Sequence, residues 1–184
     1  MINFTFLIIA LSFSSTKASC PNIVSRAEWG ARAPIGSSEM SNPVPYVVIH
    51  HGATAACATK SSCINLVKSY QILHMDTNKW DDIGYSFIVG EDGNVYEGRG
   101  WSRVGAHAPG FNTNSIGICI IGDFTSRLPN SLALNAVKNL IECGVSLGKI
   151  KPTYSLRGHR DSSATECPGN TLYTEIRKWA QYGL

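Results

Sequence analysis

The stretch PYVVIHH, residues 45–51, places two histidines at the end of a β-branched apolar run. A short apolar run of this composition is typical of a buried strand. Imidazole nitrogens are common metal ligands and proton carriers. The stretch therefore predicts a buried strand that delivers His50 and His51 to a candidate site.

Segments on either side of this strand alternate between strand and helix patterns. Two strand-like runs within residues 84–98 predict a hairpin, with a glycine supplying the turn. Asn130 or Ser131 can cap a helix that ends at Gly148 and whose face would contain Leu132, Val137, Leu140, Ile141 and Val145. The other predicted elements are helices over 63–79 and 171–181 and strands over 115–122 and 153–159. This order predicts an α/β domain, with a central mixed sheet flanked by helices.

Residues 1–19 have the layout of a secretory signal peptide. The apolar run from about Phe4 to Leu11 is too short to span a bilayer, and Ala18 or Ser19 supplies the small residue for cleavage. We therefore expect one secreted, extracellular domain over residues 20–184. Loss of Lys17 lowers the formal charge from +3 to +2, which gives no argument for nucleic acid or a membrane as a partner.

Cysteine usage leaves one thiol to be explained. In an oxidising compartment pairing is the default, and the chain has six cysteines: Cys20, Cys57, Cys63, Cys119, Cys143 and Cys167. A local bridge between Cys57 and Cys63 would be easy, and Cys119 lies in an apolar run typical of a buried free thiol. Three cysteines then remain for one further bridge.

The stretch RGHRDSSATECPG, residues 157–169, holds His159 and Cys167 in one polar loop. A catalytic zinc takes three protein ligands and keeps a fourth position open. With a third ligand from His50 or His51, this loop could wrap such an ion, and Cys167 would then be a thiolate unavailable for a disulfide. Neither a Gly-x-Ser-x-Gly elbow nor a matched carboxylate pair indicates another hydrolase class. Zinc is a hypothesis at this point.

Six segments along the mature chain carry a family resemblance. They are RAEWGAR, YVVIHHGAT, CATKSSC, HMDTNKWDDIGYSFIVGEDGNVYEGRGW, GAHAPGFNTNSIGICIIGDF and RGHRDSSATECPGN. Together they closely resemble the animal peptidoglycan recognition proteins, of the short secreted catalytic type, whose fold is shared by the amidase-type lysozyme of a bacterial virus. The resemblance runs from about Cys20 to Tyr182 and implies an amidase-type peptidoglycan recognition domain.

The resemblance implies a Zn²⁺-dependent N-acetylmuramoyl-L-alanine amidase of innate immunity. Its zinc ligands would be His50, His159 and Cys167, and recognition-only members typically replace this cysteine, often with serine. Tyr85 matches the family's active-site tyrosine. Thr165 stands where the viral enzyme has a catalytic lysine, so the resemblance does not identify the group that protonates the leaving amine. The alternative is a non-catalytic protein that binds peptidoglycan and signals to partner proteins. Scavenging and antibacterial roles are not distinguished.

The resemblance also implies a groove for bacterial peptidoglycan and two disulfides. Groove residues would be His74, Trp80, Arg99, His107 and Asn112, with Arg103 and Arg127 bordering the end that senses stem type. Because arginine pairs bidentately with carboxylates, we expect diaminopimelate-type stems. The Ser102-Arg103 pair does not assign the protein to either specificity class. The implied bridges are Cys20 with Cys143 and Cys57 with Cys63, and the expected state is a monomer.

Overall fold

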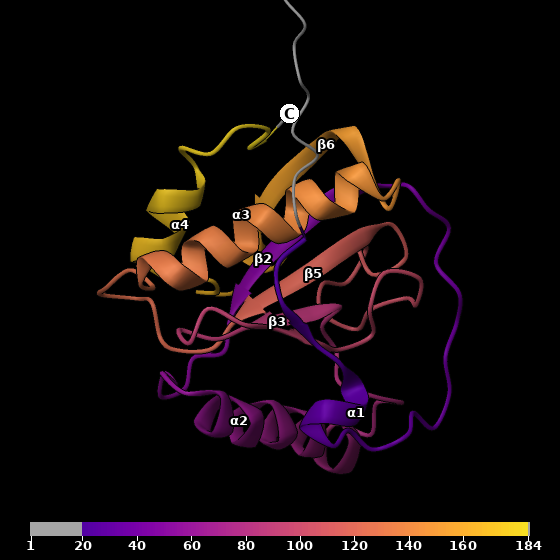
Figure 1. The fold of residues 1–184 in the computed structure, drawn as a ribbon. Helices are drawn as coiled ribbons and strands as arrows, with labels where there is room; N and C mark the ends of the chain where they lie inside the picture. The colour runs from indigo at the N-terminus through magenta and orange to yellow at the C-terminus, as the bar shows by residue number, and fades with distance from the viewer. Residues whose placement is uncertain (1–19, 184) are drawn as a thin grey trace, which may run out of the picture.

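A six-stranded mixed sheet forms the centre of the computed structural model, which describes residues 20–183 (Figure 1). The strand order is β1-β4-β3-β5-β2-β6, with β3 and β4 antiparallel and the other neighbours parallel. The strands are β1 (Ile23–Val24), β2 (Val44–His51), β3 (Phe87–Val89), β4 (Val95–Glu97), β5 (Ser115–Ile120) and β6 (Ile150–Gly158). The expected signal peptide, residues 1–19, lies outside the described residues. Within the described part, no helix has the length and apolar character needed to cross a membrane.

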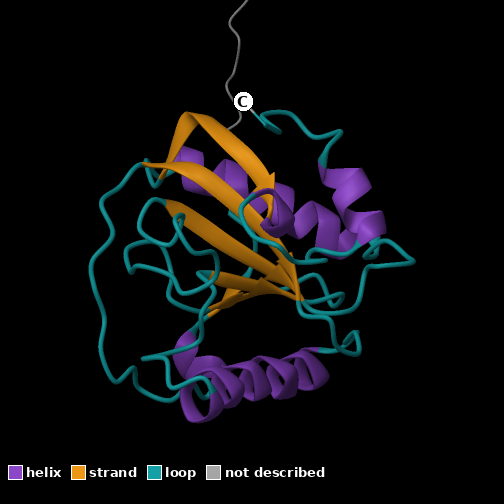
Figure 2. Ribbon diagram, turned by 180° about the vertical axis from the view of Figure 1, so that it is seen from behind, coloured by secondary structure: helices purple, strands orange, loops and turns teal. Residues whose placement is uncertain are grey.

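Helices cover both faces of this sheet (Figure 2). They are α1 (Arg26–Trp29), α2 (Lys60–Ile72), the π-helix η1 (Leu73–Thr77), α3 (Ser131–Ser146), the 3₁₀-helix η2 (His159–Asp161) and α4 (Asn170–Ile176). An apolar core lies between the sheet and α3 with α4, and a second core lies between the sheet and α1 with α2. The predicted fold class, a central mixed sheet flanked by helices, is confirmed.

Capping residues set where the helices on the α2 face begin. The Thr59 hydroxyl accepts from the Ser62 amide and the Ser62 hydroxyl accepts from the Thr59 amide, so α2 begins before the predicted residue 63. Ser25 and Glu28 form the same reciprocal pair at α1, a short helix that the sequence reasoning did not predict. Its signal, Ser-x-x-Glu, is present in the sequence.

The buried face of α3 differs from the prediction at its first turn. Asn130 caps the helix by accepting from the Ala133 amide at 2.9 Å. Leu132 is 58% exposed, whereas Val137 and Leu140 are fully buried. At about 100° per residue, Leu132 lies roughly a third of a turn from the centre of the buried face. The prediction that Leu132 shares one face with Val137 and Leu140 was therefore wrong.

The last helix is shorter than predicted because the chain returns to the sheet. α4 ends at Ile176 instead of continuing to residue 181. Residues 177–180 form turns and a bend, and Gln181 then adopts a positive φ of 69°. Its carbonyl then accepts from the Leu156 amide at 2.8 Å, and the Gly183 amide donates to the Leu156 carbonyl at 3.0 Å. These bonds cover the outer edge of β6.

Two disulfides tie the loops to this scaffold, with the predicted pairings. Cys20 is bonded to Cys143 in α3, and Cys57 is bonded to Cys63 in α2. In the described part of the chain the free cysteines are Cys119, which is buried, and Cys167. The thiol that needed explanation is therefore Cys167.

Candidate metal centre and active site

Three side chains with metal-binding atoms converge where the parallel strands end. One atom from each of His50, His159 and Cys167 lies within 4.8 Å of the other two. His50 Nδ1 is 3.8 Å from Cys167 Sγ, and the centroids of the two imidazole rings are 4.5 Å apart. The structure brings the three predicted ligands together.

Strand register explains this convergence. β2 and β6 are parallel, with Ile49 opposite Gly158, so His50 and His159 follow side by side at the carboxyl ends of their strands. His159 opens η2 directly after β6. Two ligands far apart in sequence are therefore placed by one strand pairing.

The alternation of side chains along β2 distinguishes the two neighbouring histidines. Ile49 packs into the core beneath α3, so His50 points to the opposite face and His51 to the same face as Ile49. The His51 Nδ1 accepts from the Phe124 amide at 3.2 Å. Of the pair, His50 is the one whose ring faces Cys167.

Hydrogen bonds hold the loop that carries Cys167. The Arg160 amide donates to the Cys167 carbonyl at 3.0 Å, and the Arg160 guanidinium donates to the Glu166 carbonyl and to Asn170 Oδ1. Thr165 Oγ1 accepts from the Cys167 amide at 3.2 Å. Thr165 therefore contributes to the geometry of the thiol loop, and its catalytic role stays a prediction.

Burial sets the protonation of the cluster. Burial lowers the pKa of His50 well below its usual 6.5, and the nearby His107 adds to the effect. It also lowers the pKa of His159. Burial raises the pKa of the Cys167 thiol to about 11, against a hydrogen bond from the His51 amide and the positive charge of Arg160. Both imidazoles are therefore neutral near pH 7, which is the form that binds metals.

The donor set fits a zinc ion. Tetrahedral zinc, with Zn–S ~2.3 Å and Zn–N ~2.1 Å, places sulfur and nitrogen about 3.6 Å apart. The separation of Cys167 Sγ and His50 Nδ1 is 3.8 Å. His159 Nε2 is buried and has no hydrogen-bond partner among the described residues. Two imidazoles with one thiolate suit zinc, and three protein ligands match the catalytic kind of site.

Tyr85 and His74 form the adjoining wall. The Tyr85 ring lies 5.2 Å from that of His50 and 5.5 Å from that of His74, which stacks on Trp80 at 4.7 Å. The Gly84 amide donates to His74 Nδ1 at 3.0 Å. Burial lowers the pKa of His74 to about 4 and raises that of Tyr85 well above 10. The phenol therefore stays protonated and can donate a hydrogen bond.

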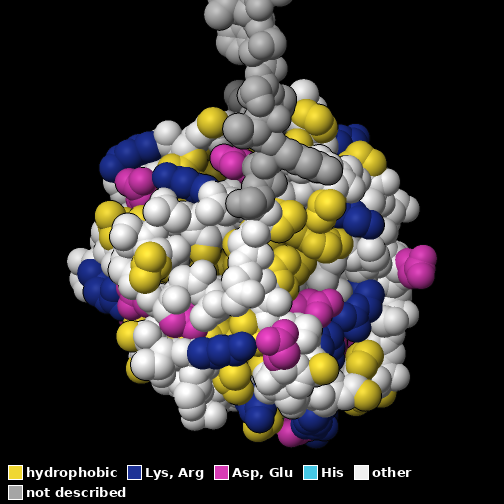
Figure 3. All heavy atoms as spheres, viewed as in Figure 1, with side chains coloured by type: hydrophobic (Ala, Val, Ile, Leu, Met, Phe, Trp, Pro, Cys, Tyr) yellow, Lys and Arg dark blue, Asp and Glu magenta, His cyan; other side chains and the backbone are white. Residues whose placement is uncertain are grey.

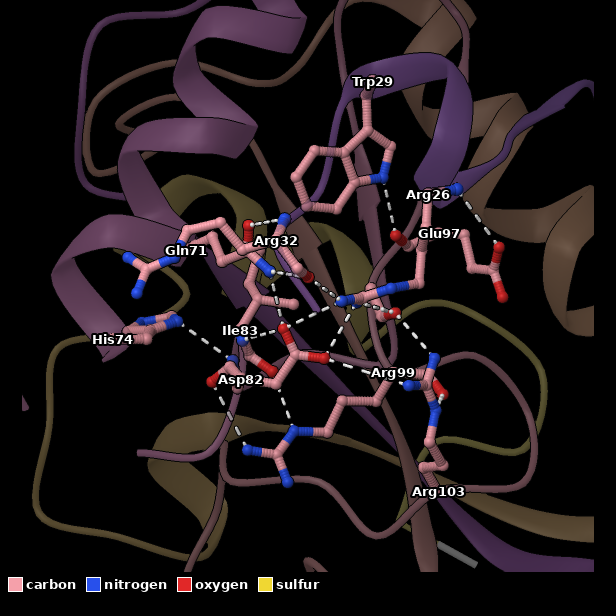
Figure 4. A network of polar contacts seen from close by, with 12 residues as sticks. Arg26, Trp29, Arg32, Gln71, His74, Asp82, Ile83, Glu97, Arg99 and Arg103 are labelled. Carbon is pink, nitrogen blue, oxygen red and sulfur yellow. Dashed lines mark hydrogen bonds and ion pairs between the residues drawn. The ribbon is translucent and has the colours of Figure 1, made fainter. Parts of the chain in front are cut away.

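A buried polar network anchors the segment before Tyr85 (Figure 4). The Asp82 side chain, 2% exposed, accepts from Gln71 Nε2 and from the Ile83 amide, both at 2.8 Å. Its other oxygen is 2.9 Å from Arg26 Nη1. Because Arg26 belongs to α1 and Gln71 to α2, the Asp82 network ties both helices to the Tyr85 segment.

Two of the predicted groove arginines join this network. Arg99 is 9% exposed, and its guanidinium donates to the carbonyls of Ile83 at 2.8 Å and Val104 at 2.7 Å. Arg103 Nε donates to the Arg99 carbonyl at 2.8 Å, and its Nη1 is 4.0 Å from Asp82. These contacts hold the loop, so ligand binding by Arg99 or Arg103 stays a prediction.

Arg127, the third arginine of the predicted groove, is paired with the hairpin turn. Its Nη1 and Nη2 donate to the two carboxylate oxygens of Glu91, both at 2.8 Å. The guanidinium also lies 5.0 Å from the centroid of the Phe124 ring. Recognition of a stem carboxylate by Arg127 likewise stays a prediction.

A pocket of about 320 Å³ lies beside the cluster. It is lined by Trp80, Ala106, His107, Pro109, Asn112 and His159. The pocket thus joins one predicted metal ligand to three of the predicted groove residues. Asn112 Oδ1 accepts from the amides of His107 at 2.7 Å and Ala108 at 2.9 Å, so this side chain shapes the pocket wall.

Sequence reasoning missed three residues that support the site. Asp82 anchors the Tyr85 segment, Arg160 holds the thiol loop, and Ser115 lies behind His107 with its hydroxyl 3.4 Å from the imidazole Nε2. No spacing pattern marks any of them. A buried carboxylate such as Asp82 has no feature in the sequence that separates it from its exposed neighbour Asp81.

The face of the molecule in Figure 3 is chemically mixed. Lysine and arginine side chains are interspersed there with aspartate and glutamate, and no histidine side chain is seen on that face. Its charges therefore do not form a field of one sign.

Comparison with known proteins identifies the class of protein that has this fold. The family described as N-acetylmuramoyl-L-alanine amidase (Amidase_2) matches residues 40–170. Peptidoglycan-recognition protein SC2 of Drosophila simulans is 42% identical over 182 residues, 99% of each chain. N-acetylmuramoyl-L-alanine amidase of Mus musculus is 41% identical over 174 residues, which cover 92% of this chain and 33% of that protein.

A solved structure agrees with these relatives. A mutant of Drosophila PGRP-LB in complex with tracheal cytotoxin superposes with a TM-score of 0.87 at 44% identity, covering 88% of this chain and 96% of that one. The chain belongs to the amidase family and, within it, to the peptidoglycan recognition proteins.

Proposed function

We propose that the protein is a zinc-dependent N-acetylmuramoyl-L-alanine amidase that binds bacterial peptidoglycan. The observation that carries this proposal is the cluster of His50, His159 and Cys167, with the thiol in no disulfide although the protein forms two others. A free thiol beside two neutral imidazoles is a ligand set for zinc. The proposed bond is the amide between the lactyl carbonyl of N-acetylmuramic acid and L-alanine.

Each ligand of the proposed zinc site has a defined task. His50 offers a neutral nitrogen from the end of β2, His159 offers one from η2 directly after β6, and Cys167 offers sulfur from a loop held by Arg160. Zinc, when bound, supplies a Lewis acid that activates water near neutral pH and polarises the scissile carbonyl. Hydrolysis adds the water oxygen to the lactyl carbonyl, and the alanine nitrogen leaves with a proton.

Tyr85 is the proposed hydrogen-bond donor to the reacting carbonyl. Its ring adjoins that of His50, and its raised pKa keeps the hydroxyl proton in place. A donor aimed at an oxygen that gains negative charge stabilises the transition state more than the substrate. Thr165 has no acidic proton to deliver, so we assign it to the thiol loop and leave the proton donor to the leaving amine open.

The pocket beside the cluster is the proposed binding site for the muramyl peptide. It contains Trp80, His107 and Asn112 together with the ligand His159, so a peptide held there would present its amide to the metal. A structural relative is bound to tracheal cytotoxin, which supports a muramyl peptide as ligand. The two disulfides and the expected signal peptide support secretion. We also propose that the protein acts in innate immunity, that it is a monomer and that it prefers peptidoglycan with diaminopimelate-type stems.

The test is cleavage of purified peptidoglycan by zinc-loaded protein, chelated protein and Cys167→Ser. We expect new muramyl and L-alanine ends only with the loaded protein, and recovery of activity when zinc is returned after chelation. If all three samples bind peptidoglycan equally and none cleaves it, the protein is a recognition protein and the enzymatic proposal fails.

A further inference from the structure

The proposed zinc ligand His50 is in contact with a second buried histidine on the side away from Cys167. His50 Nε2 lies 3.0 Å from His107 Nδ1, and the two rings are nearly perpendicular at 87°. The other His107 nitrogen, Nε2, lies 3.4 Å from the hydroxyl oxygen of Ser115. The Ser115 hydroxyl in turn donates to the Phe111 carbonyl at 2.7 Å.

The Phe111 carbonyl fixes which groups donate and which accept along this series of hydrogen bonds. A carbonyl only accepts hydrogen bonds, so the Ser115 proton must point to Phe111. The Ser115 oxygen is then free to accept from His107 Nε2–H, which leaves His107 Nδ1 as an acceptor. His50 must therefore carry its proton on Nε2 and donate it to His107. The bare Nδ1 lone pair of His50 then faces Cys167 Sγ, 3.8 Å away.

Packing holds the His107 ring in the orientation that these hydrogen bonds require. A Cβ on Gly117 would lie 2.4 Å from His107 Cδ2, and a Cβ on Gly105 would lie 2.5 Å from the same atom. The two glycines therefore form a slot for the imidazole, because any other residue would displace it. Asn112 fixes the backbone of the slot by accepting from the His107 amide.

We propose that His107 and Ser115 are positioning residues that hold His50 in its Nε2–H tautomer and so prepare Nδ1 to bind the metal. The proposal rests on the zinc site of the proposed function. It differs from the predicted role of His107 as a groove residue, since a groove contact needs no Ser115. Metal-ligating histidines commonly depend on such a partner at the second nitrogen.

Ser115 separates the two roles of His107. It is fully buried, so its hydroxyl reaches neither solvent nor substrate. An effect of Ser115→Ala on metal binding must pass through the groups that this hydroxyl contacts, His107 and the Phe111 carbonyl. Of these two, only His107 contacts His50.

Ser155 is a matched control for Ser115. Both serines lie opposite Tyr46 on strands that flank β2, both are buried, and Ser155 Oγ has no hydrogen-bond partner among the described residues.

The experiment measures zinc affinity by competition with a chromophoric chelator, and the His50 tautomer by nitrogen NMR in metal-free and zinc-loaded protein. We expect zinc affinity to fall about 10- to 100-fold in His107→Leu and about tenfold in Ser115→Ala. His107→Asn keeps an acceptor near the Nδ1 position and should recover most of the affinity. Ser155→Ala should stay within about twofold of the parent protein.

The spectra give a readout that a loss of packing alone would not produce. We expect a proton on His50 Nε2 in the parent protein with and without zinc, and a mixture of tautomers in metal-free His107→Leu and Ser115→Ala. A parent His50 protonated on Nδ1, or equal zinc affinity in Ser115→Ala and Ser155→Ala, overturns the proposal. Parent protein that binds zinc without cleaving peptidoglycan refutes the proposed amidase and leaves the tautomer result standing.

Discussion

Two buried polar clusters lie close together in this protein, and they differ in how their polar groups are satisfied. Around Asp82, Oδ1 accepts from Gln71 and from a backbone amide at 2.8 Å, and Oδ2 has no hydrogen-bond partner in the described chain but forms an ion pair with Arg26 at 2.9 Å. In the other cluster, His159 Nε2 is buried without a partner in the described chain and Cys167 forms no disulfide. An unmatched buried polar group is costly. At Asp82 the ion pair with Arg26 offsets this cost within the protein, whereas no charged group among the described residues pairs with His159 or Cys167 at hydrogen-bond distance, and we infer that a bound metal ion does so.

The largest expected effect comes from Cys167→Ser, which removes one ligand from the second cluster. We expect cleavage of muramyl peptide to fall on the order of 10³-fold or more, because activation of water and carbonyl depends on the bound metal. Unfolding of the metal-free protein should change by less than about 1 kcal/mol, since the thiol is in no disulfide. Product analysis and denaturant unfolding on the same sample measure both. Retained cleavage would contradict the distinction between the clusters.

Asp82→Asn tests the first cluster. Removing the charge leaves Arg26 partly buried without its partner and should lower the free energy of unfolding by about 3 kcal/mol. The neighbouring Asp81→Asn is the control, because Asp81 is exposed and its loss should cost about 0.5 kcal/mol or less. Urea titrations compare the two variants. Equal stabilities would show that the Asp82 network does not carry the structural role assigned to it.

Tyr85→Phe tests whether Tyr85 contributes to catalysis without contributing to metal binding at the second cluster. Loss of one hydrogen-bond donor to the reacting carbonyl should lower kcat about 100-fold. Zinc affinity should be unchanged because the phenol is not among the three ligands. Steady-state cleavage measures kcat, and chelator competition measures the zinc affinity. An unchanged kcat would remove Tyr85 from the mechanism.

The smallest effect is expected at the ion pair between Glu91 and Arg127. Like Asp82, Glu91 is paired with an arginine, but this pair is partly exposed. The hydrogen bond from Arg127 lowers the pKa of Glu91 below 4.5, so its stabilisation is present above pH 4.5 and is lost as pH falls through the lowered value. Glu91→Gln should cost about 1 kcal/mol or less at pH 7. Unfolding measured from pH 7 to pH 3 should show this difference shrinking. A difference that grows with acidity would contradict the assignment.

The strand and ligand pattern was predictable from sequence because it rests on local chemistry. The apolar run before His50 marks a buried strand, and counting cysteines in an oxidising compartment leaves one of Cys20, Cys143 and Cys167 unpaired. The choice of Cys167 as the free thiol depended on the family resemblance. The choice of His50 over His51 depended on family resemblance at first. The structure explains it by side-chain alternation along β2.

Long-range contacts explain what sequence reasoning missed. Leu132 fits a helical apolar pattern, yet the sheet reaches only the face that contains Val137. Residues 177–181 were predicted as helix. Instead, the Gln181 carbonyl accepts a hydrogen bond from the Leu156 amide at the edge of β6. The interior position of Arg99 likewise depends on carbonyls from other segments. None of these partners can be identified from neighbouring residues.

Zinc-edge X-ray absorption on protein loaded with one equivalent of zinc shows directly whether His50, His159 and Cys167 bind the metal. We expect zinc bound by one sulfur and two imidazole nitrogens, and loss of the sulfur ligand in Cys167→Ser. Zinc bound without sulfur in the parent protein, or failure to bind zinc, would contradict this assignment.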